Sequence, residues 1–187
     1  PNLLMSRPTR DVKMSSQYLD GLGRLLQTVA KQGSMVTGSS ASDLVSAIEY
    51  DGVGREQYKW TPFSSNNSGG NTHIDDGVFK QNPFVQQSTF MTAQYGPQGE
   101  TFFYGKTNFE PSPLNRISET YAAGNSWVGS ETNSEAQRRD VQMKYFLNTA
   151  TDSVRIWTVT NSSTIGQFGT YSTTAIYPSG ELYKNII

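Results

Sequence analysis

The amino-acid sequence predicts a mainly β protein of the α+β class, with an N-terminal helical segment and an antiparallel β-sandwich or barrel. Two observations lead to this prediction. Short β-prone runs that end at Gly, Pro, Asn or Asp recur through residues 55–187, which is typical of strands joined by turns. Residues 17–33 carry apolar side chains at helical spacing.

The length of 187 residues predicts a single domain. We divide it into an extended N-terminal arm over residues 1–16, a helical segment over residues 17–50 and an antiparallel β domain over residues 51–187. No internal repeat at a fixed spacing is evident. Because the chain begins with Pro1, we expect it to be a processed product or a fragment.

The arm is expected either to become ordered against a neighbouring chain or to be a flexible terminus. Pro8 restricts Arg7 to an extended backbone, and few apolar residues are available to anchor this segment. Arg7, Arg10 and Lys13 could contact an acidic neighbour or nucleic acid. Three charges are too few to indicate nucleic-acid binding.

Two helices are expected within residues 17–50. The first carries one apolar stripe, and Gly21 and Gly23 weaken it by roughly 1 kcal/mol each relative to Ala. The stripe is formed by Tyr18, Leu22, Leu25, Leu26 and Val29. Gly33 can end this helix. Residues 40–52 predict a second, short helix.

Hairpins and single strands are expected after residue 55. Residues 55–63 are a candidate strand. The segments 88–95 and 100–107 flank the turn Gly96-Pro97-Gln98-Gly99 and predict one hairpin. A second hairpin is expected between residues 141–147 and 153–160. Two further strands are expected over residues 169–177 and 181–187.

The composition excludes several kinds of site. The chain has no cysteine, so thiol nucleophiles, disulfides and zinc–thiolate centres are excluded. The net charge of −1 gives no electrostatic indication of nucleic acid or an anionic membrane. No apolar run is long enough for a membrane-spanning helix. No cofactor is expected.

The only histidine lies in Thr72-His73-Ile74-Asp75-Asp76-Gly77. A zinc site needs three or four ligands with nitrogen or sulfur character, and adjacent residues of a strand point to opposite faces. We therefore expect an exposed turn; binding of a metal by His73, Asp75 and Asp76, or catalysis by His73, is the alternative.

Three tryptophans are the candidate contact residues. Tyr58 and Trp60 share one face of a strand by alternation. Trp157 lies opposite an aliphatic face, so it is either covered by another layer or subunit or exposed to a ligand. Trp127 lies in a polar segment and is the better candidate for an exposed contact.

Carboxylates are sparse, and their spacing selects no pair for glycoside hydrolysis. The candidates are Glu49, Asp51, Glu100, Glu110, Glu119 and Asp152. No catalytic residue is therefore assigned.

Few charges and much Gly, Ser and Thr are typical of packed virion subunits and of exported β proteins. We expect a non-enzymatic structural or assembly protein, most specifically a capsid, tail or fibre subunit, in a virion or at an extracellular surface. Its expected partners are copies of itself or other structural subunits. The alternatives are a β module that binds a glycan or small ligand, and a hydrolase that uses carboxylates or His73.

Overall fold

The computed structural model describes residues 4, 7–9, 11–34 and 40–187, and the chain divides into two compact units. Unit 1 is Pro1–Val141 and unit 2 is Gln142–Ile187. The fold is mainly β with antiparallel sheets and is consistent with a sandwich-like α+β arrangement, as predicted. The described residues form no closed barrel.

Unit 1 contains a four-stranded sheet in the order β1-β2-β3-β5, and its pairs are antiparallel. Its strands are β1 (Ser15–Leu19), β2 (Leu25–Ala30), β3 (Leu44–Ala47) and β5 (Phe63–Ser64). The helices predicted within residues 17–50 are therefore wrong. Gln27 and Val29 are buried at every second position of β2, which is strand periodicity.

The physical reason for this error lies in the turn between β1 and β2. Asp20 Oδ1 accepts hydrogen bonds from the backbone N–H groups of Leu22 and Arg24, and Asp20 Oδ2 lies 2.7 Å from Arg24 Nε. Gly23 adopts a φ of 79°, which favours glycine. Leu22 is 81% exposed at the tip of this turn whereas Val29 is buried, so the predicted apolar stripe is not one continuous buried surface.

The same turn, with the sequence Asp-Gly-x-Gly-Arg, occurs again at Asp51–Arg55. Asp51 Oδ1 accepts from the N–H groups of Val53 and Arg55, Asp51 Oδ2 lies 2.8 Å from Arg55 Nε, and Gly54 has a φ of 84°. In both turns the backbone N–H of the arginine is the strongest influence that lowers the pKa of the aspartate. Two isolated copies do not define a fixed repeat spacing, so the sequence alone does not show this repeat.

A second four-stranded sheet has the order β4-β6-β7-β8. Its strands are β4 (Tyr58–Trp60), β6 (Tyr104–Phe109), β7 (Ile117–Tyr121) and β8 (Val141–Gln142). The strand predicted at residues 55–63 is confirmed in two pieces, because β4 and β5 are separated by Thr61 and Pro62 and belong to different sheets.

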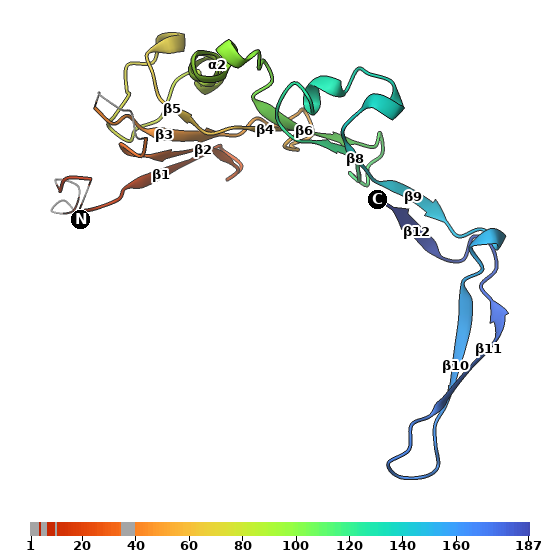
Figure 1. The fold of residues 1–187 in the computed structure, drawn as a ribbon. Coiled ribbons are helices and arrows are strands. Elements are labelled where there is room, and N and C mark those ends of the chain that lie inside the picture. The colour runs from red at the N-terminus through yellow and green to blue at the C-terminus, as the bar shows by residue number, and fades with distance from the viewer. Residues whose placement is uncertain (1–3, 5–6, 10, 35–39) are drawn as a thin grey trace. The chain divides into compact units, whose positions relative to one another are not determined.

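The α-helix α2 (Pro83–Tyr95) lies over β3 and β5 (Figure 1). The hairpin predicted around Gly96–Gly99 is therefore wrong, although Gly99 does adopt a positive φ of 85°. Pro at the first turn favours a helix here. The buried face of α2 contains Gln86 and Gln87 as well as Met91, so the apolar helical period is weak in the sequence.

Short 3₁₀ turns complete the connections. They are η1 (Ser68–Gly70), η2 (Gly96–Gln98), η3 (Val128–Ser130), η4 (Glu135–Gln137) and η5 (Ala150–Asp152).

The apolar core of unit 1 lies between the first sheet and α2. Val29, Val45, Phe63 and Met91 are buried together, and Tyr18, Phe90 and Phe103 pack against them. Gln87 Nε2 donates to Thr61 Oγ1 and to the Phe103 carbonyl, both at 3.0 Å. The helix is thereby bonded to Thr61, which lies between β4 and β5, and to Phe103, which lies just before β6.

A buried ion pair joins the first sheet to the loop that precedes α2. Lys80 Nζ lies 2.5 Å from Asp43 Oδ2, and both side chains are fully buried. Asp43 also accepts hydrogen bonds from the N–H groups of Gln32 and Gly77, each at 2.7 Å. The Gln27 side-chain amide on β2 bonds both the N–H and the carbonyl of Lys80.

Unit 2 consists of two separate two-stranded antiparallel sheets, β10-β11 and β12-β9. Their strands are β9 (Lys144–Leu147), β10 (Arg155–Thr160), β11 (Thr170–Ile176) and β12 (Tyr183–Ile186). The strands predicted over residues 169–177 and 181–187 are confirmed.

The hairpin predicted between residues 141–147 and 153–160 is wrong, because β9 pairs with β12. Asn148 directs the chain away from that hairpin. Its side chain accepts from the Leu182 N–H and donates to the Pro178 carbonyl, both at 2.8 Å. Thr149 and Asp152 form a capping box around η5.

Lys80→Met is expected to lower the free energy of unfolding of unit 1 by about 3–5 kcal/mol, because it leaves the buried Asp43 carboxylate without a cation. Urea unfolding of both variants checks this. The matched control is Lys59→Met at an exposed position of β4. A loss for Lys80→Met no larger than that of the control would contradict the structural role assigned to this ion pair.

Candidate functional site

The candidate site is a cavity of about 490 Å³ in unit 1. It lies between the C-terminal end of α2, the segment that leads into β6 and the loop that follows β7. Most of its wall is aromatic or apolar, and Glu100 and Ser126 are among its polar members. The residues used below are Tyr95, Glu100, Phe102, Phe103, Ser126 and Trp127.

Asn125 holds the two loops of the cavity together. Its Oδ1 accepts from the Thr101 N–H at 2.8 Å and the Thr101 hydroxyl at 2.9 Å, and its Nδ2 donates to the Gly99 carbonyl at 2.6 Å. Its backbone N–H donates to Glu100 Oε2 at 2.8 Å. The Glu100 carboxylate is thus held at a fixed place in the wall.

Gly124 leaves an open space between the Glu100 carboxylate and the Trp127 indole. Its φ is 114°, which favours glycine, and a Cβ built there would lie 3.5 Å from Glu100 Oε2 and 3.7 Å from Trp127 Cδ1. A carboxylate oxygen and the indole therefore border one small open space.

Trp127 and Tyr95 form the half-exposed rim, with 47% and 46% of their surface accessible. The Trp127 carbonyl accepts from the N–H and the hydroxyl of Ser130, at 2.8 and 2.6 Å, which fixes the backbone of this residue. Within the described part of the chain, neither the Trp127 indole N–H nor the Tyr95 hydroxyl has a hydrogen-bond partner. Trp127, predicted from the sequence as an exposed contact residue, therefore borders the cavity.

Glu100 has no basic partner among the described residues, unlike the six carboxylates named next. Ion pairs with Arg or Lys at 2.5–3.0 Å are formed by Asp20, Asp51, Glu110, Glu119, Glu131 and Asp152. Glu49 accepts a hydrogen bond from the Trp60 indole at 3.1 Å. In the sequence, Glu100 is only one of several scattered acids.

Tyr58 and Trp60 lie away from the cavity in an aromatic cluster on the second sheet. The Trp60 ring lies 4.9 Å from that of Tyr104 and 5.1 Å from that of Phe84. Tyr58 and Trp60 share a face, with ring centroids 6.1 Å apart. Both are partly buried, so the cluster packs unit 1 together.

The His73 segment is a bend in which His73, Asp75 and Asp76 are exposed, while Gly77 is buried and has a φ of 80°. His73 Nδ1 lies 2.5 Å from Asp76 Oδ2, and Asp76 Oδ1 lies 3.2 Å from Lys80 Nζ. Asp75 is exposed. Among the described residues, no group of three or more His, Asp or Glu side chains could hold a metal.

The turn is therefore the outer end of the buried ion-pair network. Partial burial alone would raise the pKa of Asp76, but hydrogen bonds from His73, Val78 and Lys80 outweigh it and lower the pKa to about 2. Asp43 and Lys80, which anchor this network, were not predicted, since a lysine and an aspartate 37 positions apart give no recognisable motif.

Arg7, Pro8 and Lys13 of the predicted arm are exposed, and Arg10 lies outside the described residues. Trp157 on β10 is 59% exposed. Within the described ranges, no helix is long and apolar enough to cross a membrane.

Asp76→Asn is expected to lower the free energy of unfolding by about 1 kcal/mol at pH 7. The pKa difference corresponds to about 2.4 kcal/mol, which we reduce because the side chain is 38% exposed. A lowered pKa stabilises the folded state above the unfolded pKa near 3.8 and stops doing so as the pH falls through about 2. The difference from the unaltered chain should thus persist above pH 4 and vanish near pH 2.

Unfolding curves of Asp76→Asn across this pH range test the assignment, with Asp75→Asn as the matched control. A difference that is independent of pH would contradict it.

Residues 2–141 match the model of the family described as Domain of unknown function (DUF6443). The match ends at the last residue of unit 1. Neither a curated protein nor a solved structure matches the chain. The family model covers more than half of the 187 residues, and the chain therefore belongs to the DUF6443 family.

Proposed function

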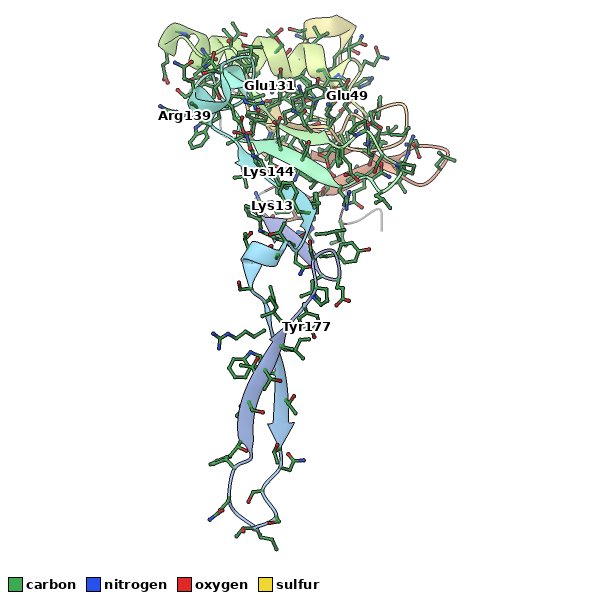
Figure 2. All side chains as sticks on the ribbon, turned by 90° about the vertical axis from the view of Figure 1, so that its right-hand side faces the viewer. Lys13, Glu49, Glu131, Arg139, Lys144 and Tyr177 are labelled. Atoms are coloured by element: carbon green, nitrogen blue, oxygen red, sulfur yellow. The ribbon has the colours of Figure 1, made fainter. Side chains whose placement is uncertain are left out.

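We propose that the chain is a non-enzymatic structural or assembly protein, and that unit 2 provides a surface that another polypeptide covers. The observation that carries this proposal is the lack of a core in unit 2. Residues 142–187 are all described, and Asn148 is the one buried residue among them. Figure 2 shows the side chains of β10 and β11 standing out from a single two-stranded ribbon.

The strands of unit 2 also have unpaired edges. Each of its sheets has two strands, so every strand has a neighbour on one side only. A two-stranded hairpin alone is marginally stable in water. An added strand, or a second layer over one face, would supply the missing hydrogen bonds and apolar contacts.

One face of β10-β11 is the best candidate for this contact. Trp157 and Val159 lie two positions apart on β10, and Val159 pairs with Tyr171 on β11. Their exposed fractions are 59%, 52% and 70%. Large aromatic side chains of this kind are enriched in the centres of protein interfaces.

The most specific form of the proposal is a virion component that assembles with copies of itself or with other structural subunits. It is supported by the low charge of the chain and the exposed faces of unit 2. The exposed arm residues Arg7, Pro8 and Lys13 fit the same role. A glycan- or ligand-binding module and a hydrolase stay as alternatives; the cavity of unit 1 favours the former.

The double change Trp157→Ser and Tyr171→Ser is expected to reduce the mass of the assembly, because it removes the two largest apolar side chains from this face. Light scattering across a range of concentrations measures the mass. We expect a discrete oligomer for the unaltered chain and a shift toward the monomer for the variant.

The matched control changes Thr158 and Ser172, a cross-strand pair next to Val159 and Tyr171, to alanine. This control should leave the mass unchanged. A strictly monomeric unaltered chain at high concentration would count against self-assembly, and equal masses for all three proteins would remove this face from the proposal.

A further inference from the structure

We propose that the cavity of unit 1 binds an organic cation, namely an ammonium or guanidinium group on an apolar stem. This ligand is separate from the polypeptide proposed to cover unit 2, since every residue of the cavity wall belongs to unit 1. The proposal rests on the charge, the aromatic walls and the hydrogen-bonding capacity of the cavity.

The charge comes from Glu100. Its Oε2 accepts one backbone hydrogen bond, and no basic side chain of the described residues pairs with it. The cavity wall contains no Lys, Arg or His. A carboxylate beside apolar walls attracts a cation more strongly than one in open water.

The aromatic walls suit the same ligand. Trp127 and Tyr95 form the rim, and Phe102 is held against the backbone of Gly129, where an added Cβ would lie 3.1 Å from the ring. Faces of aromatic rings attract ammonium and guanidinium groups, and tryptophan does so most strongly.

Elsewhere in unit 1, a carboxylate and an aromatic ring contact the same guanidinium group at two places. Arg24 bonds Asp20 and lies 4.6 Å from the centre of the Tyr50 ring. Arg55 bonds Asp51 and lies 4.5 Å from the centre of the Phe109 ring. The cavity offers the carboxylate and the rings, and a ligand would supply the cation.

The hydrogen-bonding groups favour a cation over a neutral sugar. A sugar needs several directed partners, whereas the Thr61 hydroxyl in the wall already donates to the Phe103 carbonyl at 2.8 Å and accepts from Gln87. Ser126, the Tyr95 hydroxyl and the Trp127 indole N–H are the other neutral polar groups of the wall. A volume of about 490 Å³ lies within the range of small-molecule sites.

Titration of the full chain with choline tests the proposal, with the uncharged isostere 3,3-dimethylbutan-1-ol as the matched ligand. Calorimetry measures affinity, and the indole N–H signals of the three tryptophans report the location. We expect choline to bind at least about tenfold more tightly than the alcohol and to shift the Trp127 signal but not that of Trp157. The affinity should fall as salt is added.

Two variants separate charge from shape. Glu100→Gln keeps an oxygen that can accept the Asn125 N–H, so the loops should stay in place while the charge is lost. Trp127→Leu keeps apolar volume but removes the ring. Each should weaken choline binding by about tenfold, and Asp75→Asn, which removes an exposed charge outside the cavity, should leave it unchanged.

Peptides that carry one trimethyl-lysine or one arginine show where the cation comes from. Tighter binding of a peptide than of choline points to a protein side chain, and equal or weaker binding points to a free small molecule; both support the cation site. Equal affinity for choline and the alcohol, no choline binding at all, or unchanged binding by Glu100→Gln would overturn it. Binding of neutral oligosaccharides in place of choline would instead identify a glycan site.

Discussion

The ion pair between Lys80 and Asp43 is the constraint on which the first half of unit 1 depends. A buried ion pair is stable only if the two charges pair closely and the remaining donors and acceptors of both groups form hydrogen bonds. The structure does this through the Gln32 and Gly77 N–H groups, which donate to Asp43, and through the Asp76 carboxylate, which lies 3.2 Å from Lys80 Nζ. One charged group thus fixes the sheet, the His73 turn and the approach to α2 relative to one another.

The sequence predicted strands well where strand and turn signals coincide, and poorly where a turn depends on a side chain. β4 and β11 were found because Pro62 and Pro178 follow short β-prone runs, and β12 because its run follows Pro178-Ser179-Gly180. Residues 17–30 were misread as a helix because the Asp20 carboxylate, and not the apolar stripe, decides the local conformation. The α2 helix was missed because Gln86 and Gln87 occupy its buried face.

The candidate site was half predictable. Trp127 could be singled out because a large aromatic in a polar segment is conspicuous. Glu100 could not, since what distinguishes it is its place in the cavity wall without a basic partner, and both cavities and ion pairs, such as that of Glu119 with Arg138, form only after folding. The cavity itself depends on Asn125, whose role follows from contacts with residues 24 to 26 positions away.

The repeated Asp-Gly-x-Gly-Arg turns connect parts of unit 1 that are remote in sequence. Each Asp–Arg pair closes within five residues, so it forms at little cost in chain entropy. Arg24 then reaches Tyr50, the residue just before Asp51 of the second turn, and Arg55 reaches Phe109 at the end of β6. Each locally formed turn thereby presents an arginine to a residue that is remote in the sequence. Long-range contacts then depend on short-range ones, which eases the folding of a protein rich in non-local strand pairs.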